Sequence, residues 1–80
     1  MRLDKYLKIS RIIKRRTVAN EACDAGRVVV NGKVARASYD VKIGDIIEIA
    51  FGTRIVKAQV TQISETVKKD DAISLYKIIE

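Results

Sequence analysis

The chain has 80 residues, of which 48% are hydrophobic and 32% are charged. A chain of this length forms one small domain that buries only about 60% of the surface its unfolded form exposes, which excludes a large buried substrate pocket. The balance of hydrophobic and charged residues excludes a disordered chain. The absence of His removes the commonest general base and the commonest metal ligand.

The positive charge is concentrated in the first half of the chain, and the formal net charge is +6. Residues 1–36 hold ten Lys or Arg against three Asp or Glu, whereas residues 37–80 hold six against seven. A localised basic surface indicates a polyanionic partner, either nucleic acid or an anionic membrane. The alternative is a charged face kept for solubility, but solubility does not require so uneven a distribution.

Cys23 is the only cysteine, so no internal disulfide can form, which is typical of a reducing compartment. We expect its thiol to behave as a small buried apolar group, because no His is present to activate it. The sequence shows no signal peptide and no apolar run near the roughly 18 residues of a spanning helix. A cytoplasmic protein is therefore expected.

A short helix is predicted over residues 2–9. Leu3 and Leu7 lie four positions apart and share one face, which is the spacing of a helix. Asp4 lies in the first turn, where a carboxylate suits the positive end of the helix, and it can pair with Lys8.

A basic linker and a second helix are predicted next. Residues 10–16, SRIIKRR, are expected to bury one or both Ile and to expose the basic side chains. Thr17 is the expected N-cap of a helix over residues 18–25, and Gly26 is its expected left-handed C-terminal residue. The predicted packing stripe of this second helix consists of Val18, Ala22 and Ala25, with Ala19 and Cys23 beside it.

The pattern then changes to that of strands. Asn31-Gly32 between two short strands is the strongest short hairpin signal. A polar loop is predicted over residues 64–71. Residues 72–79 are ambiguous, and the favoured interpretation is a brief helical turn at 72–75 before a closing strand. The predicted strands are residues 27–30, 33–35, 46–49, 54–63 and 76–79.

Helices followed by a small sheet predict an α+β fold, with an N-terminal helix pair packed on a small, twisted, mostly antiparallel β-sheet. The chain contains no repeat, no low-complexity segment and no shift of composition that would mark a boundary. Residues 1–80 are therefore expected to form a single domain.

Several elements occur together in the order that is typical of a known family. They are RLDKYL at the start, Ser10-Arg11, Arg15-Arg16-Thr17, Gly26-Arg27-Val28, VVVNGK and KIGDIIEI. Together they resemble the S-four RNA-binding domain, which is named for the fourth protein of the small ribosomal subunit. The resemblance extends over residues 1 to about 50. Residues 51–80 resemble the short C-terminal extension of stand-alone members of this family.

The resemblance implies an RNA-binding ribosome factor that is not an enzyme and needs no cofactor. The small members that the chain resembles are factors of ribosome-associated quality control and the fifteen-kilodalton heat-shock protein. The implied partners are rRNA of the large subunit, a stalled peptidyl-tRNA and the alanine-tail elongation factor RqcH, with no membrane and with the chain as a monomer. The implied role is support of C-terminal alanine tailing of the nascent chain.

Two alternatives to this role stay open. One is a general rRNA- and tRNA-binding factor of the heat-shock type that recycles blocked large subunits. The other is a binder of structured RNA unrelated to the ribosome. Charge and spacing alone indicate only that the chain binds structured nucleic acid.

The candidate RNA-binding surface is formed by basic residues of the first helix, the linker and the first strand. Arg2 and Arg16 match positions that the family uses for RNA contact. Asp4 is expected to orient a neighbouring Arg or to support the helix start, and Tyr6 to pack in the core rather than on a base. Arg27 either extends the surface or is a solvated strand end. The predicted RNA-binding residues are Arg2, Lys5, Lys8, Arg11, Lys14, Arg15, Arg16 and Arg27; no catalytic, cofactor-binding or metal-binding residue is predicted.

Three other classes of protein fit the sequence less well. An enzyme is disfavoured because the chain has no Gly-rich phosphate loop, no metal-spaced Cys or His, and no nucleophile beside a base. A DNA-reading helix is disfavoured because the second helix offers Asn20 with Glu21 and Asp24, which repel phosphates. A membrane-surface helix would expose bulky apolar residues, but Leu3 and Leu7 are needed for the small core.

Overall fold

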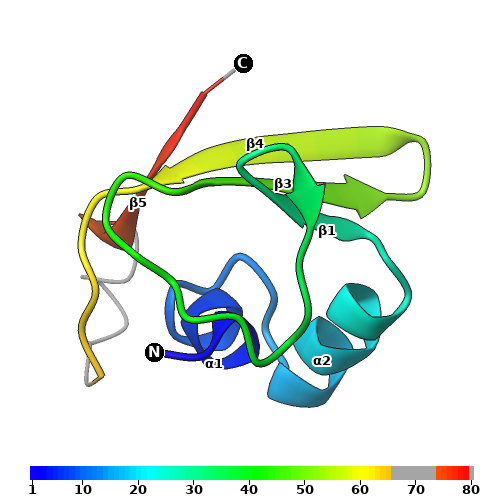
Figure 1. Ribbon diagram of the computed structural model, residues 1–80, viewed down its shortest axis with the longest axis horizontal. Coiled ribbons are helices and arrows are strands. Elements are labelled where there is room, and N and C mark those ends of the chain that lie inside the picture. Colours follow the sequence, from blue (N-terminus) through cyan, green and yellow to red (C-terminus); the bar gives the residue numbers. More distant parts are fainter. Residues whose placement is uncertain (66–73, 80) are drawn as a thin grey trace.

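The computed structural model describes residues 1–65 and 74–79, and within them two helices lie against one face of a twisted five-stranded sheet (Figure 1). The strand order is β2-β1-β3-β4-β5, and every neighbouring pair is antiparallel. This confirms the predicted α+β fold. The elements are α1 (Leu3–Ile9), α2 (Arg16–Asp24), β1 (Val28–Val30), β2 (Lys33–Val34), β3 (Ile46–Phe51), β4 (Arg54–Val60) and β5 (Tyr76–Ile78).

The predicted apolar face of α1 is the face that packs against the sheet. Leu3 and Leu7 are fully buried, as is Tyr6, whose hydroxyl donates a 2.6 Å hydrogen bond to the carbonyl oxygen of Leu75. The expected core role of Tyr6 is confirmed, and its complete burial rules out stacking on a base. The same hydrogen bond links α1 to the chain just before β5.

The linker between the helices buries Ile13 and partly buries Ile12, as predicted. The prediction for the start of α2 was wrong, because the helix begins at Arg16 rather than after Thr17. The carbonyl of Arg15 already accepts the N–H of Ala19 at 3.0 Å, which closes the first helical turn. A tertiary contact of Arg16, described below, fixes this earlier start and outweighs the capping preference of Thr17.

The C-terminal end of α2 agrees with the prediction. Gly26 has a φ of +76°, its N–H donates to the carbonyl of Cys23, and the N–H of Arg27 donates to the carbonyl of Ala22. This pair of hydrogen bonds is a Schellman motif.

The packing face of α2 differs from the predicted stripe. The side chains that α2 buries are Ala19 and Cys23, whereas Val18 is 45% exposed and Ala25 is also exposed. Only Ala22 of the predicted stripe packs partly against the core. The small residues of α2 occupy several faces, so the spacing alone did not identify the buried one.

The β1–β2 hairpin turns at Asn31 and Gly32, with φ values of +53° and +85°, as the sequence predicts. Asn31 also has a second role that the turn signal does not reveal. Its side chain donates to Oδ1 of Asp45 at 2.9 Å and accepts the N–H of Ile46 at 3.0 Å, while the Tyr39 hydroxyl donates to Oδ2 of Asp45. These contacts attach the hairpin to the start of β3.

The C-terminal half departs from the prediction only at strand ends. Strand β3 continues to Phe51, and β4 ends at Val60 rather than at residue 63. The closing strand is confirmed as β5. Most of the predicted loop at 64–71 and of the helical turn at 72–75 lies outside the described residues, although Ser74 and Leu75 have 3₁₀ conformation.

Candidate nucleic-acid interface

Six of the eight predicted RNA-binding residues belong to α1, to the linker or to the first residue of α2, and a seventh directly precedes α1. Arg2 is the N-cap of α1, and its backbone forms a β-bridge with Asp40. The neighbouring N–H of Leu3 donates to the carbonyl of Tyr39 at 2.8 Å, so the start of the chain is fixed rather than frayed. All of these basic side chains are exposed except Lys5, which is half-buried: Arg2, Lys8, Arg11, Lys14, Arg15 and Arg16.

Asp4 is the centre of the polar contacts beneath this surface. Its side chain is only 3% exposed, and its Oδ1 accepts hydrogen bonds from Nε of Arg2 at 3.2 Å and from the backbone N–H of Lys5 at 2.8 Å. Its Oδ2 accepts Nδ2 of Asn20 at 3.2 Å and Nη2 of Arg2 at 3.4 Å, and lies 3.5 Å from Nε of Arg16. A buried carboxylate is stable only when it is paired and hydrogen-bonded in this way.

The electrostatics of Asp4 reflect these partners. Burial alone would raise the pKa of its carboxyl group. The hydrogen bonds from Arg2, Asn20 and the Lys5 N–H, together with the positive charge of Arg16, outweigh burial and lower this pKa to about 2. Asp4 is therefore a carboxylate at neutral pH, and it attracts both guanidinium groups.

Arg2 and Arg16 are thereby held against one carboxylate, although Arg2 is the N-cap of α1 and Arg16 begins α2. Their side chains are 51% and 49% exposed, so each guanidinium group contacts Asp4 with some of its five N–H donors and presents others to solvent. A guanidinium held by a fixed partner loses little freedom when it binds a phosphate. This confirms the expectation that Asp4 orients a neighbouring Arg, and the expected pairing with Lys8 is replaced by the pairs with Arg2 and Arg16.

The linker presents its basic residues from a fixed backbone. Arg11 has a left-handed conformation with a φ of +62°, and its N–H donates to the carbonyl of Lys8 at 3.1 Å. Ser10 is buried, and the N–H of buried Ile13 donates to the carbonyl of Leu7. These anchors leave the side chains of Arg11, Lys14 and Arg15 outside, as the sequence predicts.

Two predicted residues have different surroundings. Nζ of Lys5 lies 3.6 Å from the carboxylate of Glu65, so part of its charge is compensated inside the molecule. Arg27 does not join the cluster of Arg2, Asp4 and Arg16. It lies in a separate groove between α2 and the end of β3.

Asn20 is the residue of this site that sequence reasoning missed. The sequence presents it only as an exposed polar position on α2, whereas in the structure it donates to Asp4, sixteen positions earlier. An Asp in the first turn of one helix and an Asn near the middle of the next are the only signals, and they acquire meaning once the two helices are packed together.

Other chemistries find little support in the described part of the chain. Cys23 is buried, and burial raises the pKa of its thiol to about 11, which makes it unreactive. Residues 1–65 and 74–79 contain no group of three or more His, Cys, Asp or Glu that could hold a metal ion. Neither described helix has the length and apolar composition that crossing a lipid bilayer requires.

The comparisons of this sequence with known proteins agree with one another. The model of the S4 domain, the S-four RNA-binding domain, matches residues 1–47. The RQC P-site tRNA stabilizing factor of Streptococcus pneumoniae is 53% identical over 79 residues, which are 99% of this chain and 90% of that protein. The factor of the same name from Bacillus subtilis is 50% identical over 80 residues, with coverage of 100% and 93%.

A solved structure agrees with these sequence matches. The trimeric structure of heat shock protein 15 from Vibrio cholerae superposes with a TM-score of 0.90 at 31% identity, covering 99% of this chain and 81% of that one. The fold and the sequence therefore point to the same group of proteins.

Proposed function

The chain belongs to the S4 domain family, and from this premise we propose that it binds RNA as a factor of ribosome-associated quality control. In this proposal it binds a large ribosomal subunit that carries a stalled peptidyl-tRNA, contacting rRNA and that tRNA. It acts there together with RqcH and supports C-terminal alanine tailing of the nascent chain. The role is one of binding and positioning, without catalysis or a cofactor, in the cytoplasm.

The observation that carries the RNA-binding part is the cluster of Arg2, Asp4 and Arg16. It fixes two half-exposed guanidinium groups on a rigid helix pair, with further exposed basic side chains on the adjoining linker. A-form RNA hides its base edges in a deep and narrow major groove, so proteins recognise it chiefly through shape, phosphates and 2′-hydroxyls. A rigid basic surface suits this kind of recognition, and an inserted recognition helix is not needed.

The ribosomal part of the proposal is supported by the relatives. Proteins that are 50% and 53% identical over nearly the whole chain are named as factors that stabilise P-site tRNA in ribosome-associated quality control. At this level of identity and coverage, the same role is the simplest expectation for this chain. Arg2, Asp4 and Arg16 all belong to one chain, so the proposal requires only a monomer.

Residues 51–80 are proposed to be an extension of the same RNA-binding unit. Strand β4 pairs with β3 from the Ile46–Gln59 pair to the Phe51–Arg54 pair, and β5 pairs with β4. The extension thus widens the sheet on which the helix pair rests.

Sedimentation tests the ribosomal assignment. Tagged protein in a cell lysate is expected to migrate with large subunits that carry peptidyl-tRNA, and hydrolysis of that tRNA is expected to release it. The matched control is the same gradient with Lys77→Ala, an exposed residue of β5, which should migrate like the wild type. Migration as a free small protein would remove the ribosome from the function and leave a binder of other structured RNA.

A reconstituted tailing reaction tests the finer assignment. Purified subunits with peptidyl-tRNA, RqcH and alanyl-tRNA should add longer alanine tails when the protein is present. Unchanged tail length together with normal binding would exclude the tailing role and favour the alternative of a general factor that recycles blocked subunits.

A further inference from the structure

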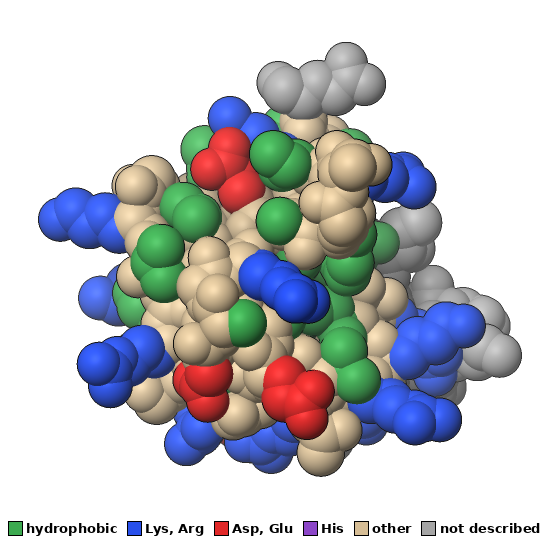
Figure 2. Space-filling model, turned by 90° about the vertical axis from the view of Figure 1, so that its right-hand side faces the viewer, with side chains coloured by type: hydrophobic (Ala, Val, Ile, Leu, Met, Phe, Trp, Pro, Cys, Tyr) green, Lys and Arg blue, Asp and Glu red, His purple; other side chains and the backbone are tan. Residues whose placement is uncertain are grey.

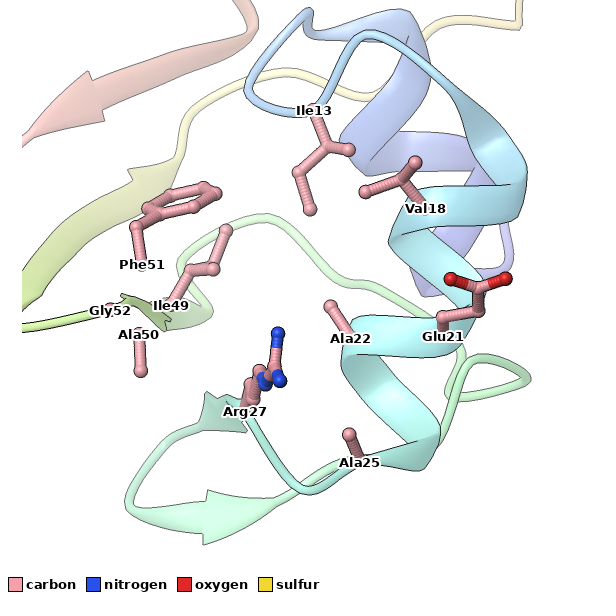
Figure 3. A pocket seen from close by; sticks show the side chains of 10 residues that line it. All are labelled: Ile13, Val18, Glu21, Ala22, Ala25, Arg27, Ile49, Ala50, Phe51 and Gly52. Carbon is pink, nitrogen blue, oxygen red and sulfur yellow. The ribbon is translucent and has the colours of Figure 1, made fainter.

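A groove of about 390 Å³ opens between α2 and the end of β3 (Figure 3). Val18 and Ala22 of α2 form one wall, Ile49 and Phe51 of β3 form the opposite wall, and Ile13 of the linker lies at one end. On the side of the molecule where α2 and the β3–β4 hairpin end, hydrophobic side chains are grouped, with Lys and Arg side chains around the margin and a few Asp or Glu side chains beside them (Figure 2). The groove is thus a mainly apolar opening whose surroundings carry charges of both signs, with Lys and Arg the more numerous.

Arg27 is the one cation among the described residues that line this groove. Its backbone is fixed, because its N–H donates to the carbonyl of Ala22 and its carbonyl accepts the N–H of Ala50, both at 3.0 Å. Its guanidinium group extends between α2 and the end of β3 (Figure 3). No Asp or Glu of the described chain forms an ion pair with it. A fixed and unpaired cation in an apolar groove favours an occupant with hydrogen-bond acceptors.

Phe51 supplies a flat surface in the same groove, on the wall opposite α2. It is the only Phe of the chain, lies at the last position of β3 and is 41% exposed. Unpaired bases of RNA stack on aromatic rings, and arginine both stacks on bases and donates to their acceptor atoms. An aromatic ring, an apolar wall and a guanidinium group around one opening are therefore the features that hold a single nucleobase.

The groove continues from the basic surface rather than standing alone. Ile13, at its end, is followed directly in the chain by Lys14, Arg15 and Arg16. Glu21 lines both this groove and the hollow formed with Asp4 and Arg16. The carboxylate of Glu21 points away from the opening (Figure 3), so Arg27 is the charged group inside it.

We propose that this groove binds one unpaired nucleotide of the RNA that lies on the basic surface. The base stacks on Phe51, and the guanidinium group of Arg27 donates to its acceptor edge. The inference rests on the proposed RNA-binding function and extends it from recognition of phosphates and shape to recognition of a single unpaired base. It also gives Arg27 a role different from that of the other predicted basic residues.

Two RNA hairpins that differ only in one bulged nucleotide test this proposal. The bulged nucleotide is 2-aminopurine, whose fluorescence falls when it stacks. Wild-type protein is expected to bind the bulged hairpin about tenfold more tightly than the fully paired one, which is the order of one base stacked on an aromatic ring, and to quench the fluorescence. Phe51→Leu is expected to lose this preference while binding the paired hairpin like the wild type. Arg27→Gln also removes a charge, so it is expected to bind both hairpins more weakly and to lose the preference, which is the ratio of the two affinities. Arg36→Gln, at another exposed Arg, is the matched control and should keep the preference.

The outcomes separate this proposal from the proposed function. Equal binding of both hairpins by the wild type, without quenching, would overturn the nucleotide groove and leave the RNA-binding surface intact. Failure to bind either hairpin at low salt would contradict RNA binding itself. A preference for the bulge that survives in Phe51→Leu would place the base elsewhere and would also overturn the groove.

Discussion

Asp4 connects α1 with α2 through its contacts to Arg2, Asn20 and Arg16. Because Asp4 is almost fully buried, its carboxylate is stable only while these groups hydrogen-bond or pair with it. The contacts in turn fix the positions of the Arg side chains. A single acidic residue among seven basic ones thus determines how the two central Arg side chains are presented.

The acid sensitivity of the fold is predicted from this contact. The pKa of Asp4 in the folded protein is about 2, below its usual value of 3.8, so its contribution to stability is present above the usual value and is lost as the pH falls toward 2. Between about pH 5 and pH 2, the free energy of unfolding should fall by up to about 2 kcal/mol more in the wild type than in Asp4→Asn. Urea unfolding across this range measures the difference, and parallel pH profiles of the two proteins would contradict it.

Individual residues also show which features of the site the sequence predicts and which depend on the packing of the helices. Arg2 and Arg16 were predicted to contact RNA because they match family positions, and the burial of Tyr6 and Cys23 followed from their types. The link from Asp4 to Asn20 and Arg16 depends on how two helices pack, and a pattern along one chain does not contain that geometry.

The linker between α1 and α2 is the element that departs most from ordinary backbone preferences. Arg11 occupies a left-handed position after α1, where Gly is the usual residue. A side chain with a Cβ in this conformation costs roughly 1–2 kcal/mol. The structure therefore keeps a cation at a position where stability alone would favour Gly.

Substitution of Arg11 should separate stability from binding. Arg11→Gly is expected to raise the free energy of unfolding by about 0.5–1 kcal/mol, since it relieves the strain, and to weaken RNA binding, since it removes a cation of the proposed RNA-binding surface. Arg11→Ala is the matched control, because it loses the same charge and keeps the Cβ. It should show the same loss of binding without the gain in thermal or urea stability. Equal stability of the two variants would refute the strain at this position.

The contact between α1 and β5 gives another prediction at this scale. Tyr6→Phe removes the hydrogen bond from the hydroxyl to the carbonyl of Leu75 and should lower the free energy of unfolding by about 1 kcal/mol. The backbone amides of β5 should exchange with solvent faster than in the wild type, whereas those of β1 should change less. Hydrogen exchange followed by NMR measures both, and unchanged exchange in β5 would show that other contacts hold this strand.

Elements were predictable where local chemistry decides them. Gly26 and Asn31-Gly32 marked a helix end and a hairpin correctly, because positive φ angles favour these residues. The start of α2 and its buried face were not predictable, because the pairing of Arg16 with Asp4 and the position of Ala19 over the core are tertiary effects.

The whole molecule divides its charge between two parts of one fold. The helix pair and the linker carry a cluster of exposed cations, whereas the exposed Lys and Arg of the rest of the chain are more widely spread, and Lys57 of the sheet pairs with Glu48 at 3.6 Å. The thin core needs both helices on one face of the sheet, and this placement leaves the basic side chains on the outside. The same packing of the helices on the sheet thus buries the core and places basic side chains on the surface of the helix pair.

The salt dependence of RNA binding depends on the basic surface of the whole molecule. If the basic surface neutralises about five or six phosphates, a plot of log K against log salt should have a slope of about −4 to −5 on duplex RNA. Binding titrations at several salt concentrations measure the slope, and Lys14→Ala should reduce its magnitude by about 1. A flat response would rule out an interface dominated by phosphates.

The most direct test is equilibrium binding of four proteins to purified large subunits that carry peptidyl-tRNA: the wild type, Arg2→Ala, Arg16→Ala and Lys77→Ala. Because Arg2 and Arg16 present fixed guanidinium groups, their loss should weaken binding about tenfold each, the order of one charge-assisted contact, while circular dichroism shows a folded chain. Lys77→Ala should bind like the wild type. If Arg2→Ala and Arg16→Ala, both folded, bind as tightly as Lys77→Ala, the surface built around Asp4 is not the one that contacts RNA.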